Sequence, residues 1–340
     1  MPGRVAIVGA TGAVGQEFIK ILQQRNFPLD EVVFLASARS AGKMVEFRGR
    51  EHTIAELTEE SFDGVNLALF SAGSDISKRF APIAVACGAV VVDNSSAFRM
   101  DSDTPLVVPE VNPQDIAGHN GIVANPNCST IIMVVPVWPL YKHNPIRRMV
   151  VSTYQAASGA GYRAMLELQQ QSRDVLEGRP PKPQALPHPI AFNLFSHDSA
   201  IGPDGYNTEE TKMVNETRKM FHDPDIRITA TCVRVPVLRA HSEAINLTFE
   251  RPITEHEVRE ILAEAPGVRI VDDRQANRFP MPIETSGGDD VLVGRIRQDI
   301  SQPDGRGIDL FVCGDQLRKG AALNAVQIAE HLLQMQALSP

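Results

Sequence analysis

One of the four cysteines lies where its thiol can act as a nucleophile. Cys128 stands in NPNCST, residues 125–130, directly ahead of an apolar stretch, so we predict that a helix begins there. The positive end of a helix dipole lowers the pKa of a thiol and favours the reactive thiolate. The other cysteines lie in apolar segments, where cysteine acts as a small hydrophobic side chain. They are Cys87, Cys232 and Cys313.

A glycine-rich turn is the second feature that can do chemistry. Gly9, Gly12 and Gly15 lie in GATGAVG, after a predicted strand and at the start of a predicted helix. Glycines there allow a tight turn and the close approach of a pyrophosphate, which helix N-terminal amides hold. The spacing is GxxGxxG rather than GxGxxG, and its position after the first strand favours a dinucleotide site. A turn without a ligand is the alternative.

The end of the second predicted strand distinguishes NAD from NADP. An NAD site usually has Asp or Glu there to bind the ribose hydroxyls. Residues 36–40 read ASARS, with no acid. Arg39 can pair with a 2′-phosphate, to which Ser37 and Ser40 can donate hydrogen bonds. We therefore predict NADP, the alternative for Arg39 being an ordinary surface arginine.

A dinucleotide site and an activated thiol together indicate aldehyde or acyl chemistry. Attack of a thiolate on an aldehyde gives a hemithioacetal, and loss of hydride to the nicotinamide leaves a thioester. Cys128 would carry that acyl group.

The first 125 residues predict the frame that positions the glycine turn. Short β-branched runs alternate with amphipathic stretches, which is typical of βαβ units around a parallel sheet. After the turn, apolar residues from Val14 to Leu22 recur with helical spacing. The predicted strands are Arg4–Val8, Val32–Ala36, Leu67–Ser71 and Val90–Asp93, with a further strand and a helix start within 121–130.

Beyond residue 130 the pattern changes to α+β. Residues 178–206 are rich in Pro and Gly, which favours a long ordered loop. RMVVSTYQ and AINLTFE alternate polar and apolar residues, as expected for a sheet with one covered face. Predicted strands are 147–154, 226–237, 243–249 and 291–298, and predicted helices are 208–222, 254–264 and 319–337. We predict an α/β protein with a Rossmann-type domain of residues 1–127 plus about 317–340, and a second α+β domain of residues 128–316.

Composition and charge exclude several classes of protein. A length of 340 residues, at about 150 residues per domain, suggests two domains. With 33 Lys and Arg against 41 Asp and Glu, the net charge of −8 argues against non-specific nucleic-acid binding. The longest apolar stretch, Ile131–Leu140, is too short to span a bilayer. Without a signal peptide or a metal-binding spacing of Cys and His, we expect a cytoplasmic protein with reduced thiols and no metal.

Six short motifs follow one another along nearly the whole chain. They are GATGAVG, SSAFRM at 95–100, NPNCST, YQAASGAG at 154–161, EETKM at 209–213 and RVPVLRAHSE at 234–243. Together they resemble bacterial aspartate-β-semialdehyde dehydrogenase. The resemblance implies NADPH-dependent conversion of 4-phospho-L-aspartate to L-aspartate 4-semialdehyde and phosphate, a step toward lysine, diaminopimelate, threonine and methionine. It also implies a homodimer built through the second, catalytic domain.

The resemblance assigns the reacting residues. Cys128 matches the acyl-carrying nucleophile. His241 matches the general acid/base, and its ordinary pKa of about 6.5 suits proton transfer at neutral pH. Gln155 matches a substrate contact that orients the acyl-enzyme, and Asn127 would support the oxyanion and the phosphate. Arg234 matches the residue that binds the substrate α-carboxylate with its planar fork.

The resemblance also assigns the phosphate, ammonium and cofactor contacts. Arg99 and Lys212 match the phosphate site, as a dianionic leaving group requires. Glu209 would bind the substrate α-ammonium. Residues of both predicted domains are expected to bind NADP. They are Gly9, Thr11, Gly12, Ala13, Val14, Ser37, Arg39, Ser40, Ser71, Ser158, Gly159 and Gln316.

Ordinary structural roles stay open for several of these residues. Glu209, Lys212 and Glu216 have a helical spacing that surface ion pairs also produce. Arg234 and His241 are seven residues apart, so on one strand they would point to opposite faces. The chain must turn between them if both line one site.

Other functions also stay open. N-acetyl-γ-glutamyl-phosphate reductase shares the fold and the acyl-phosphate chemistry, but its substrate has no free amine for Glu209 to bind. A glyceraldehyde-3-phosphate-type dehydrogenase would need the missing acid after the second strand. A non-catalytic paralogue would be expected to lose the nucleophile or the base, and both Cys128 and His241 are present.

Overall fold

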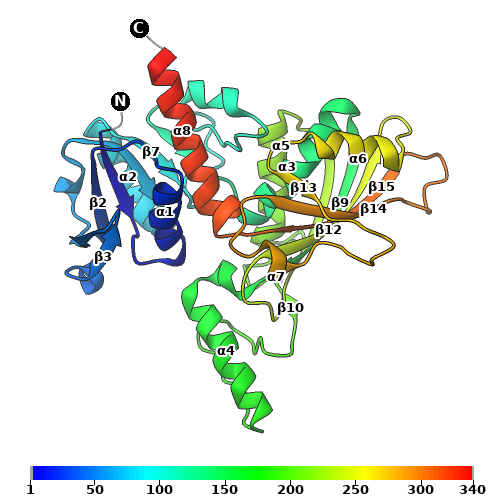
Figure 1. Cartoon of the computed structure of the whole chain (residues 1–340), viewed down its shortest axis with the longest axis horizontal. Coiled ribbons are helices and arrows are strands. Elements are labelled where there is room, and N and C mark those ends of the chain that lie inside the picture. Colours follow the sequence, from blue (N-terminus) through cyan, green and yellow to red (C-terminus); the bar gives the residue numbers. More distant parts are fainter. Residues whose placement is uncertain (1–2, 339–340) are drawn as a thin grey trace. The chain divides into compact units, whose positions relative to one another are not determined.

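The chain forms two compact units (Figure 1). The computed structural model describes residues 3–338. The first unit runs up to Asn127 and resumes at Ala321, and the second unit is Cys128–Gly320. From the sequence we predicted that the chain re-enters the first unit at about residue 317. Among the described residues no helix is both long and apolar enough to cross a membrane.

The first unit is built on a six-stranded sheet in which every neighbouring pair is parallel. The parallel α/β sheet that the alternating pattern predicts is therefore confirmed. Its strand order is β5-β2-β1-β6-β7-β8. The strands are β1 Arg4–Val8, β2 Glu31–Ala36, β5 Ala55–Glu56, β6 Val65–Phe70, β7 Val90–Asp93 and β8 Ile122–Ala124. A separate hairpin, β3 Met44–Phe47 and β4 Arg50–Thr53, follows β2.

Helices cover both faces of this sheet. Helices α1 (Ala13–Gln24) and α8 (Leu323–Leu338) share one apolar cluster with Val5 and Ile7 of β1. Helix α2 (Ser74–Ala86) packs with Ala6 and Val8 in the opposite cluster. Alternate residues of β1 are thus buried on opposite faces, as in doubly covered parallel sheets.

The second unit is built on a mixed seven-stranded sheet. Its order is β10-β11-β9-β12-β15-β14-β13, with β9 and β11 parallel and β9, β12, β15 and β14 antiparallel in succession. The strands are β9 Ile146–Gln155, β10 Phe195–Ser196, β11 Arg227–Arg234, β12 His241–Phe249, β13 Val268–Ile270, β14 Val291–Gln298 and β15 Gly307–Gly314. A short helix, α7 (Pro282–Thr285), precedes β14.

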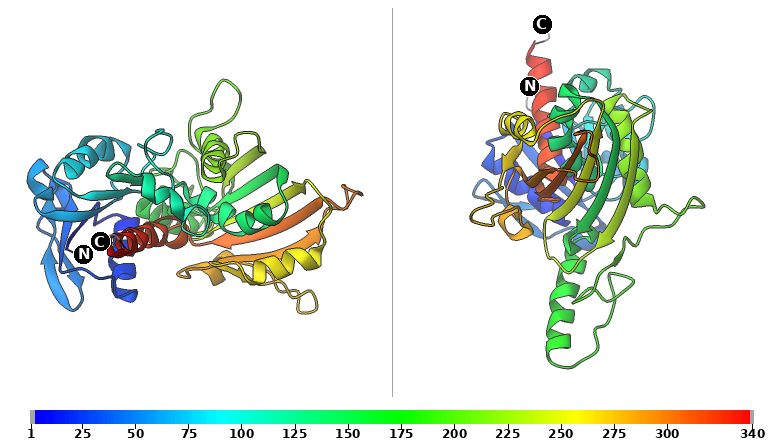
Figure 2. Two further views of the ribbon diagram at one scale, coloured as in Figure 1. Left: turned by 90° about the horizontal axis from the view of Figure 1, so that it is seen from above. Right: turned by 90° about the vertical axis from the view of Figure 1, so that its right-hand side faces the viewer.

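Three helices cover one face of this second sheet (Figure 2). They are α3 Cys128–His143, α5 Thr208–Phe221 and α6 Glu255–Ala263. On β9, Met149 and Val151 are buried while Arg148 and Tyr154 are exposed, which is the alternation predicted for a sheet with one covered face. Helix α3 continues through Pro136 and Pro139, and it is apolar on all sides.

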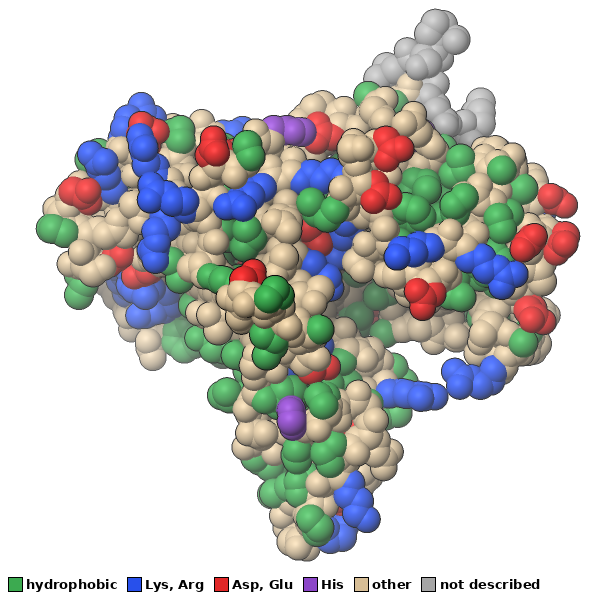
Figure 3. Space-filling model, turned by 180° about the vertical axis from the view of Figure 1, so that it is seen from behind, with side chains coloured by type: hydrophobic (Ala, Val, Ile, Leu, Met, Phe, Trp, Pro, Cys, Tyr) green, Lys and Arg blue, Asp and Glu red, His purple; other side chains and the backbone are tan. Residues whose placement is uncertain are grey.

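An arm projects from the second unit (Figure 2, right). It consists of α4 (Tyr162–Leu176), which the sequence did not predict, and the loop that follows. The loop is pinned to α4, because Glu167 Oε2 accepts the Gln184 N–H at 2.9 Å and Gln171 Oε1 accepts the Ile190 N–H at 2.8 Å. Apolar side chains are exposed on the arm among polar ones (Figure 3). The segment predicted as one loop over 178–206 also contains the short strand β10.

Candidate active site

The glycine turn of the first unit leaves no room for side chains. Gly9 has φ +90°, and a Cβ added there would lie 2.3 Å from the carbonyl oxygen of Ser71. A Cβ on Gly15 would lie 2.2 Å from the carbonyl oxygen of Gly9. Gly12 is the N-cap of α1, and no side chain of residues 3–338 caps the helix. The glycines therefore allow the turn to pack tightly against its own backbone, and the helix amides that follow form a backbone cradle that fits a nucleotide pyrophosphate.

The remaining cofactor candidates of this unit lie at the same ends of β1, β2 and β6. Thr11 is exposed within the turn, and Ala13 and Val14 open α1. Ser71 follows β6, and its N–H donates to the Val8 carbonyl at 2.9 Å. Ser37 and Arg39 are exposed after β2, whereas Ser40 is buried in a short 3-10 turn.

Arg99 is held at the carboxyl ends of two neighbouring strands. Its Nε donates to the Asn125 carbonyl at 2.9 Å, beyond β8, and its Nη2 donates to the Asn94 carbonyl at 2.8 Å, beyond β7. The Asn125 side chain in turn accepts from Asn324 at 2.7 Å. Asn127, the last residue of this stretch, is buried. Ligands of open parallel sheets bind at this edge.

Cys128 is the first residue of α3, so the predicted helix start is confirmed. The cysteine is partly exposed, whereas Cys232 and Cys313 are buried. Burial raises the pKa of the Cys232 thiol and raises that of Cys313 to about 12, so both stay protonated. Cys87, expected to be buried, is exposed near the end of α2, so that expectation is wrong.

Gln155 ends β9 and is buried next to two polar partners. Its Nε2 donates to Ser129 Oγ at 2.8 Å, in the first turn of α3, and to Glu209 Oε1 at 3.0 Å. Its Oε1 accepts no hydrogen bond from any described residue. The amide thus links the start of α3 to Glu209 and keeps one acceptor for another molecule.

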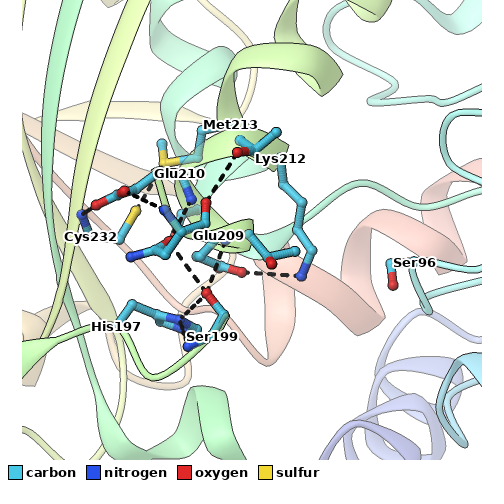
Figure 4. A network of polar contacts seen from close by, with 12 residues as sticks. Ser96, His197, Ser199, Glu209, Glu210, Lys212, Met213 and Cys232 are labelled. Carbon is cyan, nitrogen blue, oxygen red and sulfur yellow. Dashed lines mark hydrogen bonds and ion pairs between the residues drawn. The ribbon is translucent and has the colours of Figure 1, made fainter. Parts of the chain in front are cut away.

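Glu209 is buried in the first turn of α5 (Figure 4). Its Oε2 lies 3.3 Å from Lys212 Nζ, and the side chain of Lys212 is 28% exposed. Asn207 caps the helix and forms a capping box with Glu210, which fixes where the helix begins. Glu216 is also buried, so the alternative of an ordinary solvated ion-pair face is wrong for both glutamates.

Arg234 and His241 meet because the chain turns between two strands. Arg234 ends β11 and His241 begins β12, and both are buried. A Cβ on Gly159 would lie 3.0 Å from Arg234 Nη1 and 3.0 Å from His241 Nε2, so both side chains face this glycine. The turn that a shared site requires is therefore present. Ala240, directly before His241, has φ +72°, and its N–H donates to Gln316 Oε1 at 2.8 Å.

His241 is held as a neutral imidazole. Its Nδ1 accepts the Ala156 N–H at 3.0 Å, so the neutral ring carries its hydrogen on Nε2, which has no described partner. Burial, followed by the charge of Arg234, lowers the pKa of His241 to about 3. The expectation of an ordinary pKa is therefore wrong, because the imidazolium would lose its hydration and face a guanidinium.

Comparison with known proteins identifies the family. The family model described as "Semialdehyde dehydrogenase, NAD binding domain" matches residues 4–119, and "Semialdehyde dehydrogenase, dimerisation domain" matches residues 137–319. The chain is 59% identical over 333 residues to an aspartate-semialdehyde dehydrogenase of Synechocystis sp., covering 98% of each chain. The chain belongs to the aspartate-semialdehyde dehydrogenase family. A relative of that name from Aquifex aeolicus is 53% identical over 335 residues, which cover 97% of this chain and 98% of the relative.

Solved structures of aspartate-semialdehyde dehydrogenases share the whole architecture. The enzyme II of Vibrio cholerae, complexed with ASA, is 46% identical with a TM-score of 0.94, covering 98% of this chain and 99% of that one. The Candida albicans enzyme, solved with NADP, is 25% identical with a TM-score of 0.75, covering 98% of each chain.

The second unit also gathers its cofactor candidates. Ser158 is buried in a 3-10 turn, and its hydroxyl accepts from Gln316 Nε2. Because Gln316 also fixes Ala240, the Ser158–Gly159 turn is joined to the start of β12. Ser158, Gly159 and Gln316 thus lie together, beside His241.

Sequence reasoning missed two buried or half-buried acids near this site. Asp198 Oδ1 lies 3.0 Å from Arg234 Nε, and it comes from the loop after β10. Glu243 lies two residues after His241 on β12, and neither carboxylate oxygen has a partner among the described residues. The HSE motif placed Glu243 in the family pattern, whereas no local signal marked Asp198. Among the described residues no Cys, His, Asp and Glu cluster is suited to a metal ion.

Proposed function

We propose that this chain reduces 4-phospho-L-aspartate to L-aspartate 4-semialdehyde with release of phosphate. The observation that carries the proposal is the set of charges beside the nucleophile's helix. Arg234 and Glu209 are buried cation and anion within one unit, and they suit the α-carboxylate and the α-ammonium of an amino acid. The Vibrio cholerae relative was solved with ASA, in keeping with this substrate.

Cys128 carries the chemistry in this proposal. Its sulfur attacks the acyl carbon, the C–S bond forms, and the bond from that carbon to the phosphate oxygen breaks. Arg99 and Lys212 stabilise the leaving phosphate, and Asn127 supports the oxyanion. After reduction of the thioester, the C–S bond breaks and the aldehyde is released. Gln155, through its unpaired Oε1, orients the acyl group.

His241 serves the substrate oxygen through Nε2. As a neutral imidazole it donates a hydrogen bond from Nε2 to the oxygen that becomes negative in the transition state. A thiolate or alkoxide formed beside the ring would raise the pKa of His241 through its negative charge and allow proton transfer.

NADPH, when bound, supplies the hydride for the thioester. The first unit fits this cofactor through the cradle at Gly9 and Gly15, where a Cβ would collide. For the adenosine ribose, β2 ends without an acid and Arg39 is exposed beside it, which favours the 2′-phosphate of NADP. Ser158, Gly159 and Gln316 would contact the nicotinamide half from the second unit. The match of residues 137–319 to a dimerisation domain supports a homodimer built through this unit.

The test is formation of NADPH from L-aspartate 4-semialdehyde and NADP⁺, followed by absorbance. We expect a rate that requires phosphate, because phosphate must cleave the thioester in this direction. Activity with N-acetyl-glutamate semialdehyde instead would overturn the assignment of Glu209. Protein that binds NADP but acts on neither aldehyde would show a non-catalytic member of the family.

A further inference from the structure

A short segment beside the second sheet contacts both charges that the substrate is expected to meet. Strand β10 pairs antiparallel with β11, with Phe195 opposite Arg234, and the His197 N–H donates to the Cys232 carbonyl at 2.8 Å. The next two residues, Asp198 and Ser199, leave the sheet edge. This segment, residues 195–199, is the end of the loop whose role the sequence did not reveal.

We propose that Asp198 positions Arg234 for the α-carboxylate of the substrate. Arg234 Nε lies 3.0 Å from Asp198 Oδ1, and this is the one hydrogen bond that the side chain of Arg234 makes to any described residue. The side chain of Arg234 is 6% exposed and that of Asp198 is 23% exposed. A guanidinium this deeply buried needs a counter-charge to stay in place. Although burial opposes ionisation, the charge of Arg234 holds the pKa of Asp198 below its ordinary value.

The pairing leaves the outer end of the guanidinium for the substrate. Arginine has five N–H donors in a rigid plane, and Asp198 uses the one on Nε. Nη1 lies against Gly159, next to His241 Nε2. Asp198 therefore fixes the plane of the Arg234 guanidinium. Its Nη1 and the imidazole of His241 then both face the space beside Gly159. Arg234 pairs with Gln155 at the end of β9, and the Gln155 side chain donates to Ser129, the residue after Cys128.

The neighbouring Ser199 supports the opposite charge (Figure 4). Its Oγ accepts the Glu209 N–H at 3.1 Å and donates to Asn207 Oδ1 at 3.3 Å, at the start of α5. The Ser199 N–H in turn donates to His197 Nδ1 at 3.2 Å. Adjacent residues thus hold Arg234 and the helix start that carries Glu209. The 195–199 segment sets the spacing between the carboxylate site and the ammonium site, which makes it a specificity element for α-amino acids.

The inference rests on the proposed function, so wild-type activity with L-aspartate 4-semialdehyde is measured first. If the wild type is inactive, the proposed function fails and this inference falls with it. If it is active, Asp198→Asn should raise KM by about tenfold or more while kcat stays within about twofold, as loss of uniform binding predicts. Asp204→Asn, the same change in an exposed turn of the same loop, is the matched control and should leave KM unchanged.

Two outcomes of this measurement contradict the inference. An unchanged KM would show that Arg234 needs no support from Asp198. A lower KM would show that Asp198 occupies the place of the substrate carboxylate and must be displaced. Asp198→Glu, which keeps the charge, should recover part of the lost affinity. This recovery would distinguish a role in positioning Arg234 from a general loss of folding. Thermal unfolding of each variant checks that the variants are folded.

Substrate analogues distinguish a role in positioning Arg234 from a merely structural one, because a structural defect would lower kcat/KM equally for every aldehyde. With 3-aminopropanal, which lacks the carboxylate, Asp198→Asn and the wild type should have the same kcat/KM. With 4-oxobutanoate, which lacks the amine, the loss in Asp198→Asn should persist. Ser199→Ala should show the reverse pattern, because it acts through Glu209. Equal losses of Asp198→Asn on all three aldehydes would overturn the proposal.

Discussion

The two units recognise their ligands by different physical means. In the first unit the nucleotide turn is made of backbone, and Gly9 and Gly15 are required because of space. In the second unit the candidate site is made of ionisable side chains buried in protein, such as Glu209, Arg234 and His241. A backbone site depends on the volume of each residue, whereas a site of buried charges depends on how each charge is matched.

The second unit shows two ways of burying an ionisable group. Arg234 is paired with Asp198, and Glu209 is paired with Lys212 and accepts a hydrogen bond from Gln155. His241 has no counter-charge in contact among the described residues, and its lowered pKa leaves it neutral. The affinity of such a site can be changed by removing the charge of one partner while the side-chain volume stays the same. The following substitutions test that contrast.

Replacing Cys128 with Ala should have the largest effect. Because the thioester cannot form, we expect kcat to fall by about 10,000-fold or more. NADP binding should stay within about twofold, since the cradle lies in the other unit. NADPH formation and fluorescence titration with NADPH measure the two quantities, with the exposed Cys87→Ala as control. Loss of NADP binding in the Cys128 variant would break the separation of the two sites.

Adding a side chain in the glycine turn is the reciprocal experiment, because it should impair the nucleotide site and leave Cys128 reactive. A Cβ at Gly15 would lie 2.2 Å from the Gly9 carbonyl, so Gly15→Ala must shift the backbone at a cost of about 1–3 kcal/mol. We expect NADP affinity to fall by about tenfold or more, which corresponds to about 1.4 kcal/mol. Alkylation of Cys128 by iodoacetamide, followed by peptide mass spectrometry, should keep its rate. Gly118→Ala is the control, because a Cβ there meets nothing within 4 Å. Wild-type NADP affinity in Gly15→Ala would contradict the cradle.

A substitution of Arg39 tests whether the first unit also recognises its ligand through a charged side chain. Arg39→Asp should weaken NADP binding by about 10- to 100-fold, the effect of losing a charged hydrogen-bond partner, and should leave NAD binding unchanged or stronger. Titrations with both cofactors measure this shift in preference. Arg50→Asp, on the exposed edge of β4, is the control for net charge. An unaltered ratio of the two affinities would show that the NADP preference lies elsewhere.

Glu243 should give the smallest effect. Burial raises the pKa of this carboxyl well above its ordinary value of 4.5, so the folded protein keeps a proton that the unfolded chain releases. Its contribution to stability is thus present in acid and is lost as the pH rises above about 4.5. Glu243→Gln needs no such proton, and we expect it to match the wild type near pH 4.

Near pH 8 Glu243→Gln should have a higher free energy of unfolding than the wild type, because the wild-type carboxyl has by then lost its contribution. Urea unfolding at both pH values measures it, with the exposed Glu250→Gln as control. The same difference between Glu243→Gln and wild type at both pH values would show that the carboxyl is not protonated in the folded state.

The first unit could be predicted from sequence in detail because its signals are local. The strand Arg4–Val8 was predicted with the bounds that the structure has, and the turn at Gly9 follows from residue types within seven positions. Cys128 as the start of a helix was equally local, since the polar NPN segment precedes an apolar run. In such places the neighbours in sequence are also the neighbours in space.

Non-local pairing explains what could not be predicted. Asp198 reaches Arg234 because β10 pairs with β11, across a difference of 36 positions in the chain. Helix α4 was missed although its sequence is amphipathic. Two of its four buried residues, Glu167 and Gln171, are polar, and they are buried because they bind the backbone of the following loop. The lowered pKa of His241 depends on burial in the finished fold, which the residue type does not reveal.

The second unit begins and ends at one place. A Cβ on Gly320, its last residue, would lie 3.0 Å from the Cβ of Cys128, its first. Such closely spaced termini are those of an inserted domain, which can be exchanged or excised with little disturbance of the host. The nucleophile Cys128 belongs to the inserted unit, and the glycine turn belongs to the host unit. Exchange of the insert between related proteins would therefore change the substrate and keep the coenzyme, which makes this junction a natural point of recombination in evolution and a practical one for building chimeric enzymes.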